Sequence, residues 1–194
     1  MQLFSKKLSE VNLVLLVAAF LTLTGNFTFL EKTLQIYPLS ENWLFLGSLF
    51  LFLFTFLSAL LIVFCFRWSV KPILILLLLV SAVVTYSTNN FGIVFDHNMI
   101  TNTFETDTSE FSDLVSVKSM LYFCLLGLIP SIYVWKIPLV KASIKAQLWQ
   151  RIKMLFVLIV VFVIVVLSFS KHYSSFAREN RDLRLYITPT YFLY

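Results

Sequence analysis

The stretch that decides the fold class is ILILLLLVSAVV, from Ile73 to Val84. It holds no charged side chain, and it lacks the alternation of apolar and polar residues that marks a membrane β-barrel strand. In lipid, every backbone polar group must be paired within the protein, so only helices and closed barrels cross a membrane. The stretch therefore predicts a membrane-spanning helix.

Four other apolar runs have a similar character, and the composition agrees with them. A hydrocarbon core about 30 Å thick needs roughly 20 apolar residues per helix. Hydrophobic residues make up 59% of the chain and charged residues only 13%, which excludes an ordinary soluble domain. We expect an all-α membrane protein with five transmembrane helices in a domain 1–171 and short interfacial helices on the outer face. The expected spans are about 12–30, 43–66, 73–91, 119–135 and 152–170.

Basic residues near the ends of the runs indicate the orientation, because cytoplasmic segments carry an excess of Lys and Arg. With five spans, one side receives nine basic residues and a single acidic one, Glu10. We expect that side to be cytoplasmic, which places the N-terminus inside and the C-terminus outside. The nine are Lys6, Lys7, Arg67, Lys71, Lys136, Lys141, Lys145, Arg151 and Lys153.

The longest connection, about 92–118, joins the third and fourth runs on the outer face and is acidic. From Asp96 to Phe111 it has four acidic side chains and no Lys or Arg. Asp107 and Glu110 have the spacing of a capping box, in which the two side chains satisfy the first backbone N–H groups of a helix. We therefore expect short helices that lie along the membrane surface.

A helix in this connection would align three polar side chains, Asn102, Thr106 and Glu110, which recur at four-residue steps. An amide, a hydroxyl and a carboxylate can accept hydrogen bonds from an ammonium group, and the first two can also donate to phosphate oxygens. The alternative is that Asp107 and Glu110 only cap a helix in a solvated acidic loop. The residues alone leave both interpretations open.

The tail 172–194 carries Arg178, Arg181 and Arg184 at three-residue steps. We expect them to form a stripe on an interfacial helix whose other side includes Phe176 and Leu183. Such a stripe could recruit a specific lipid through its phosphates. Alternatively, it could make only ordinary pairs with membrane lipid phosphates or with the neighbouring acids Glu179 and Asp182.

The chain offers little for metal binding or disulfide formation. His97 stands beside Asp96 and His172 is isolated, so we expect no metal site among them. Cys65 and Cys124 lie in different apolar runs, and we expect two free thiols that pack as small apolar groups.

Two segments resemble a known family, the lipid A phosphoethanolamine transferases of Gram-negative inner membranes, which include the mobile colistin-resistance enzymes. The first is FDHNMITNTFETDTSE, from Phe95 to Glu110, and the second is KHYSSFARENRDLRLYITP, from Lys171 to Pro189. Five spans in the same order complete the likeness. Phe91-Gly92 departs from the Tyr-Gly that is common in the family.

The resemblance implies a reaction in which phosphoethanolamine passes from phosphatidylethanolamine to a lipid A phosphate at the periplasmic face of the inner membrane. Asn102, Thr106 and Glu110 match the family positions that line the phosphoethanolamine pocket, while Arg178, Arg181 and Arg184 could contact lipid phosphates. The family's zinc and threonine nucleophile lie in a C-terminal soluble domain, so we expect this chain alone to be inactive and to bind no cofactor. Its expected partners are the two lipids, surrounding membrane lipids and the enzyme's own catalytic domain, and no nucleic acid.

Two other classes of protein compete with this interpretation. A transporter would usually place ionisable groups at mid-membrane, yet the five runs contain no acidic residue and no histidine. A non-enzymatic membrane scaffold of an envelope complex remains an alternative, because the acidic connection could bind a protein.

Overall fold

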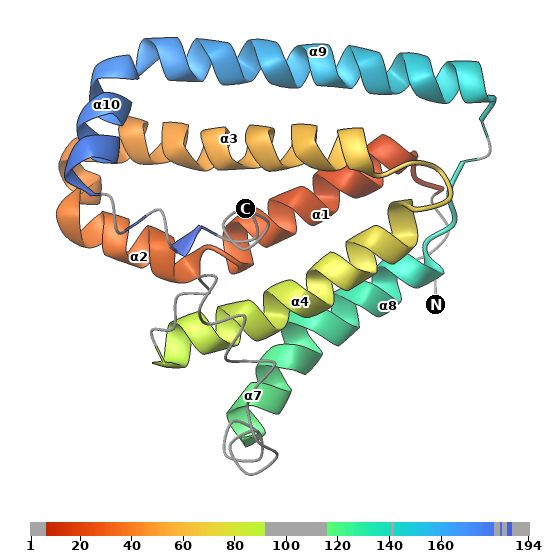
Figure 1. Ribbon diagram of the computed structural model, residues 1–194, viewed down its shortest axis with the longest axis horizontal. Coiled ribbons are helices and arrows are strands. Elements are labelled where there is room, and N and C mark those ends of the chain that lie inside the picture. The colour runs from red at the N-terminus through yellow and green to blue at the C-terminus, as the bar shows by residue number, and fades with distance from the viewer. Residues whose placement is uncertain (1–6, 92–115, 141, 181–182, 184–185, 188–194) are drawn as a thin grey trace.

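A computed structural model describes residues 7–91, 116–140, 142–180, 183 and 186–187. Within these residues the regular elements are all helices, which confirms the expected fold class. The helices, labelled as in Figure 1, are α1 Glu10–Thr24, α2 Phe27–Ile36, α3 Leu39–Phe64, α4 Val70–Phe91, α7 Val117–Tyr122, the π-helical η1 Phe123–Leu128, α8 Ile129–Lys136, α9 Ile144–Ser168 and α10 Ser170–Glu179.

Four continuous helical segments are long and apolar enough to cross a membrane. Two of them are α3 and α9, the third is α4 without its last residue, and the fourth is the succession α7, η1 and α8, which runs from Val117 to Lys136. The pair α1 and α2 gives a fifth span if the two count as one. The chain is therefore a multi-pass membrane protein.

The first expected run, 12–30, is not one straight helix, because α1 and α2 meet at an angle of 53°. The Asn26 amide donates to the carbonyl oxygens of Leu21 and Thr22 at 3.3 and 3.4 Å, and so caps the last turn of α1. Gly25, the residue beyond α1, donates its N–H to the same Leu21 carbonyl. These bonds replace a continuation of the helix.

The helices form two layers with α1 crossing between them (Figure 1). In one layer α3 packs along α9, and in the other α4 packs along η1 and α8. We call the end where α1 and α9 begin and α8 ends the basic end, and the end that carries α2 and α10 the α10 end. The described chain begins at the basic end, beside the start of α1, and its last helix, α10, lies at the α10 end.

The main core lies around α1, toward the basic end. Side chains of α1, α3 and α4 that are almost fully buried interlock there, with single contributions from α8 and α9. They include Leu13, Val17, Leu61, Leu74 and Val134. Burial of these side chains fixes the rotation of each helix about its axis, so the polar groups at both ends acquire defined neighbours.

The second layer depends on one close approach between helices. A Cβ placed on Gly127, in η1, would lie 3.2 Å from the Cβ of Ala82 and 3.4 Å from a terminal carbon of Leu79. A methyl group at this position would press on Ala82, so the hydrogen of Gly127 lets η1 pack closely on α4. A π-helical turn is rare, and where it occurs it is mostly a single-turn bulge inside a longer α-helix, as it is here between α7 and α8.

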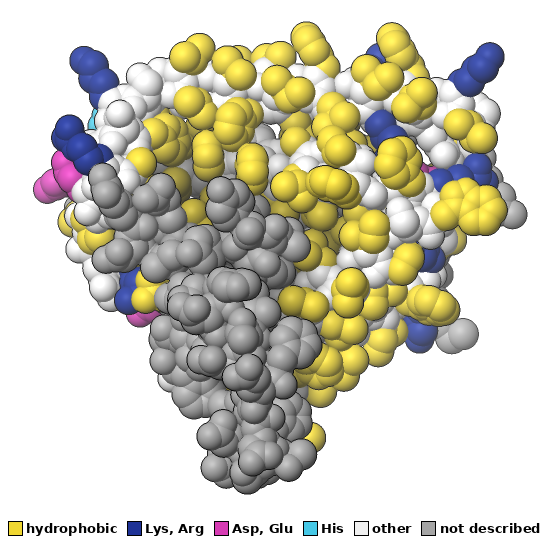
Figure 2. Space-filling view, viewed as in Figure 1, with side chains coloured by type: hydrophobic (Ala, Val, Ile, Leu, Met, Phe, Trp, Pro, Cys, Tyr) yellow, Lys and Arg dark blue, Asp and Glu magenta, His cyan; other side chains and the backbone are white. Residues whose placement is uncertain are grey.

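Most of α9 faces outward, where Figure 2 shows a surface of hydrophobic side chains. Its buried residues are Arg151, Leu158 and Val165, at seven-residue steps. This spacing keeps them on one stripe, which faces α3. An arginine therefore occupies a position of the stripe that two apolar residues fill further along.

Candidate functional site

The expected pocket residues Asn102, Thr106 and Glu110 lie outside the described residues, as do Asp96, His97 and the capping pair Asp107 and Glu110. Their roles stay predictions, and so do the short surface helices expected there. The structure does describe the helices on both sides of this segment, the end of α4 and the start of α7.

The ends of α4 and α7 are held together by polar side chains. The Tyr86 hydroxyl and the Ser116 hydroxyl are 2.9 Å apart, and the rings of Tyr86 and Tyr122 meet edge to face at 5.6 Å. Ser116 and Ser119 form a reciprocal capping box that starts α7. The last turns of α4 and the start of α7, which flank residues 92–115 in the sequence, therefore lie next to each other.

Helix α2 also contacts the end of α4 through a polar side chain. The Thr28 hydroxyl, in the first turn of α2, donates to the side-chain oxygen of Asn89, in the last turn of α4. The amide of Asn90 donates to the carbonyl oxygen of Tyr86 at 3.0 Å. Hydroxyl and amide groups thus surround the point where the acidic connection begins.

On the other side of the α10 end, α10 docks through an aromatic cluster. Phe29 of α2, Phe45 of α3 and Phe176 of α10 are buried together, and Leu183 is buried with them. The Tyr173 and Ser48 hydroxyls are 3.0 Å apart. Burial raises the pKa of Tyr173 above its ordinary value, and the hydrogen bond with Ser48 offsets only part of this rise. Phe176 and Leu183, which were expected on the apolar side of an interfacial helix, are both buried in this cluster, and Leu183 lies beyond the end of α10.

The expected single helix carrying three arginines is wrong, because α10 ends at Glu179 and Asn180 has a non-helical backbone conformation. Only Arg178 of the three lies among the described residues. It is 77% exposed and lies 3.7 Å from the Glu179 carboxylate, a loose surface pair that contributes little to stability. Its guanidinium remains accessible to a ligand at the α10 end.

Of the two histidines only His172 lies among the described residues, and both cysteines do. His172 is exposed and stacks on Phe45 with ring centroids 5.7 Å apart. Cys65 and Cys124 are free thiols, as predicted, although only Cys65 is buried. Among the described residues, no three His, Cys, Asp or Glu side chains come together as metal ligands.

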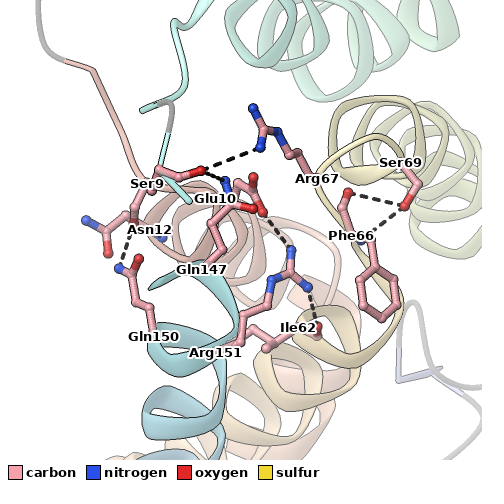
Figure 3. A network of polar contacts seen from close by, with 11 residues as sticks. Ser9, Glu10, Asn12, Ile62, Phe66, Arg67, Ser69, Gln147, Gln150 and Arg151 are labelled. Atoms are coloured by element: carbon pink, nitrogen blue, oxygen red, sulfur yellow. Dashed lines mark hydrogen bonds and ion pairs between the residues drawn. The ribbon is translucent and has the colours of Figure 1, made fainter. Parts of the chain in front are cut away.

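The basic end holds a buried ion pair that the sequence analysis missed (Figure 3). One terminal nitrogen of Arg151 donates to the Glu10 carboxylate at 2.8 Å, and the other donates to the Ile62 carbonyl oxygen at 3.1 Å. Both side chains are less than a tenth exposed. The ring of Phe66 lies 5.2 Å from the guanidinium carbon, and Gln150 donates to Ser9 beside it.

This network joins the start of α9 to the start of α1 and the end of α3. A small pocket beside it is lined by Ser9, Glu10, Gln147, Gln150 and Arg151 together with three apolar residues. It lies where α1 and α9 begin, whereas the expected headgroup residues follow the end of α4 in the sequence, so the pocket is not made by those residues. The signal in the sequence was Glu10, the one acid among nine bases, together with the seven-residue steps from Arg151 to Leu158 and Val165.

The family model described as phosphoethanolamine transferase EptA/EptB matches residues 53–194, most of the chain. The chain belongs to the EptA/EptB phosphoethanolamine transferase family. The phosphatidylethanolamine transferase Mcr-1 of Escherichia coli is 33% identical over 187 residues, which are 96% of this chain and 35% of that protein. The phosphoethanolamine transferase EptA of Escherichia coli K12 is 27% identical over 91% of this chain and 33% of its own length.

A solved structure of a family member shares the fold. The integral membrane protein lipooligosaccharide phosphoethanolamine transferase A of Neisseria meningitidis has a TM-score of 0.89 at 22% identity, over 97% of this chain and 35% of that one. The chain thus spans about a third of the length of the EptA and Mcr relatives it matches. The aligned third carries the membrane helices described above.

Proposed function

We propose that this chain is the membrane domain of an enzyme that transfers phosphoethanolamine from phosphatidylethanolamine to a lipid A phosphate. Membership of the EptA/EptB family carries the proposal. The donor headgroup would bind at the α10 end, in the acidic connection, with Glu110 paired to the ethanolamine ammonium and with Asn102 and Thr106 on the phosphate. The inner membrane and an outward-facing α10 end belong to the same proposal.

The described part of the α10 end supports this location. Glu31, Glu41 and Glu179 are exposed there, and so are Lys118 and Lys171, so both signs of charge are present. A zwitterionic headgroup carries both a phosphate and an ammonium, and a surface that bears both signs of charge does not repel it as a whole. Arg178, with Arg181 and Arg184, would contact lipid A phosphates.

The membrane domain would accelerate the reaction by bringing the two substrates together. Both lipids are held by acyl chains in one leaflet, with their reacting groups at the same depth. Binding them to one platform makes their encounter effectively intramolecular, a change that can remove a large part of a barrier. The bonds from α2 to α4 and from α4 to α7 would keep this platform in place.

The chemical step is proposed to occur in a soluble domain of the full-length protein, where zinc and a threonine nucleophile are expected. Zinc in such a site would polarise the donor phosphate and favour the ionised nucleophile. The described residues offer no comparable group of ligands. The role of this chain is then to bind and orient lipids.

The proposal is tested by the lipid A of a colistin-sensitive Gram-negative host. Expression of the full-length protein should add phosphoethanolamine, seen as a mass increase of lipid A, and should raise colistin tolerance. Residues 1–194 expressed alone should reach the membrane and add nothing. Transfer by residues 1–194 would place the chemistry in this chain, against the proposal. Unmodified lipid A in cells with ample full-length protein would favour the scaffold alternative.

A further inference from the structure

The basic end presents a stripe of exposed side chains on α9, which we call the Lys–Trp stripe: Lys145, Trp149 and Lys153. They recur at four-residue steps and so lie on one face of the helix. At about 100° per residue, this face is opposite to the buried position of Arg151. The stripe therefore points away from the bundle, toward the surrounding lipid.

The geometry of the stripe brings charge and aromatic surface to one level. The Lys153 ammonium lies 5.5 Å from the centre of the Trp149 ring, so this lysine reaches back toward the start of α9. Long basic side chains extend in this way from apolar surface to the headgroup level, and tryptophan favours the same level. Trp149 is 60% exposed and has room beside it for a lipid.

The charge of this end is almost entirely unneutralised. Glu10 is the one acidic residue among the described residues of the basic end, and its carboxylate is paired with the buried Arg151. Figure 2 shows several Lys and Arg side chains over this part of the molecule. The exposed bases of the basic end, none of which forms an ion pair with an acidic side chain among the described residues, are Lys7, Arg67, Lys136, Lys145 and Lys153.

We infer that the Lys–Trp stripe binds the headgroup of an anionic phospholipid, with phosphatidylglycerol as the simplest example. Two ammonium groups suit a phosphate that carries a neutral glycerol. A zwitterionic headgroup fits less well, because its own ammonium would find no free carboxylate among the described residues nearby. The cytoplasmic bias of Lys and Arg explains how many bases lie at this end, but it does not require them to flank a tryptophan on one face.

The inference gives the two ends of the molecule different lipid preferences. The mixed charges of the α10 end suit a zwitterionic donor, and the basic end suits an anionic lipid that is not a substrate. Such a lipid would hold α9 at a defined depth, which matters because few residues of α9 are buried against the rest of the bundle. Binding at the stripe does not depend on the proposed transfer reaction.

Native mass spectrometry of the full-length protein, with phosphatidylglycerol or phosphatidylethanolamine added in detergent, tests the inference. The double variant Lys145→Gln with Lys153→Gln should lose phosphatidylglycerol affinity by about 20- to 30-fold, since each surface lysine contributes roughly a five-fold factor. The matched control, Lys118→Gln with Lys171→Gln, removes the same charge at the α10 end and should change this affinity by less than about three-fold. Unchanged affinity in the first variant, or an equal loss in both, would overturn the proposal.

A second readout locates the lipid. In a variant that retains Trp149 and has phenylalanine at Trp43, Trp68 and Trp135, brominated phosphatidylglycerol should quench the fluorescence more than brominated phosphatidylethanolamine does. The preference should disappear when Lys145 and Lys153 are also replaced by Gln. Equal quenching by the two lipids before that replacement would also contradict the inference. If the single-tryptophan variant does not fold, mass spectrometry alone decides.

Discussion

Arg151 shows how one residue can be read in two ways. In the sequence it belongs to a basic segment that the orientation of a membrane protein explains. In the structure it lies in the buried stripe of α9 and binds both Glu10 and the Ile62 carbonyl oxygen. A buried pair loses much of its attraction to desolvation, but the loss of one partner leaves the other charge buried and unpaired.

We predict that Arg151→Gln lowers the free energy of unfolding by about 3–5 kcal/mol, because the Glu10 carboxylate loses its partner in a dry site. Thermal unfolding in detergent measures the effect. The matched control is Arg178→Gln, whose exposed pair with Glu179 contributes about 0–1 kcal/mol. The further change Glu10→Gln should recover part of the loss, so a double variant no better than Arg151→Gln alone would argue against the pairing.

At the scale of elements, the close packing of η1 on α4 depends on Gly127. We predict that Gly127→Ala destabilises the protein by about 1–3 kcal/mol, because the added methyl group meets Ala82 at a tight 3.2 Å. Gly47→Ala is the matched control, since a Cβ at that position of α3 has nothing within 4 Å. Both changes raise helix propensity, so their difference in melting temperature isolates packing. Equal melting temperatures would mean that the helices can separate without cost.

The apolar runs were visible in the sequence because each follows from the local chemistry of a helix in lipid. The two free thiols could also be predicted in this way. The bend at Gly25 and Asn26 could not, since a polar residue in an apolar run has several possible roles. The Glu10 to Arg151 contact spans 141 residues and depends on how two helices rotate, which neither helix determines alone.

The candidate site likewise has one part that the sequence predicts and one part that only the structure shows. Asn102, Thr106 and Glu110 were predicted from a pattern in the sequence. The contacts that join α2, α4 and the start of α7 could be found only in the structure. Tyr86 and Ser116 are 30 positions apart and polar residues of ordinary type, so nothing in the sequence marks them as partners. These contacts bring together the helices that precede and follow the acidic connection.

For the whole molecule, the distribution of basic residues predicts that the basic end is cytoplasmic. Single cysteines at Asn98 and Asn180, in a protein without Cys65 and Cys124, should react with an impermeant thiol reagent from the periplasmic side. A cysteine at Ser143, which caps the start of α9, should be protected until the membrane is opened. The reverse pattern would invert the orientation and place the proposed donor site on the wrong side for lipid A.

The central claim is that the α10 end binds the phosphoethanolamine headgroup and that Glu110 pairs with its ammonium. Equilibrium binding of a short-chain phosphatidylethanolamine to full-length Glu110→Gln tests it most directly. The variant keeps the shape and removes the charge, and a hydrogen bond to a charged group contributes roughly 1.5–3 kcal/mol, so affinity should fall by about 10- to 100-fold.

Glu31→Gln, which removes an exposed charge from α2 at the same end, serves as the control and should leave affinity within about three-fold of the parent. Melting temperatures of the three proteins should agree, because Gln also serves at the third position of a capping box. A Glu110→Gln protein that folds normally and binds phosphatidylethanolamine as tightly as its parent would contradict the account.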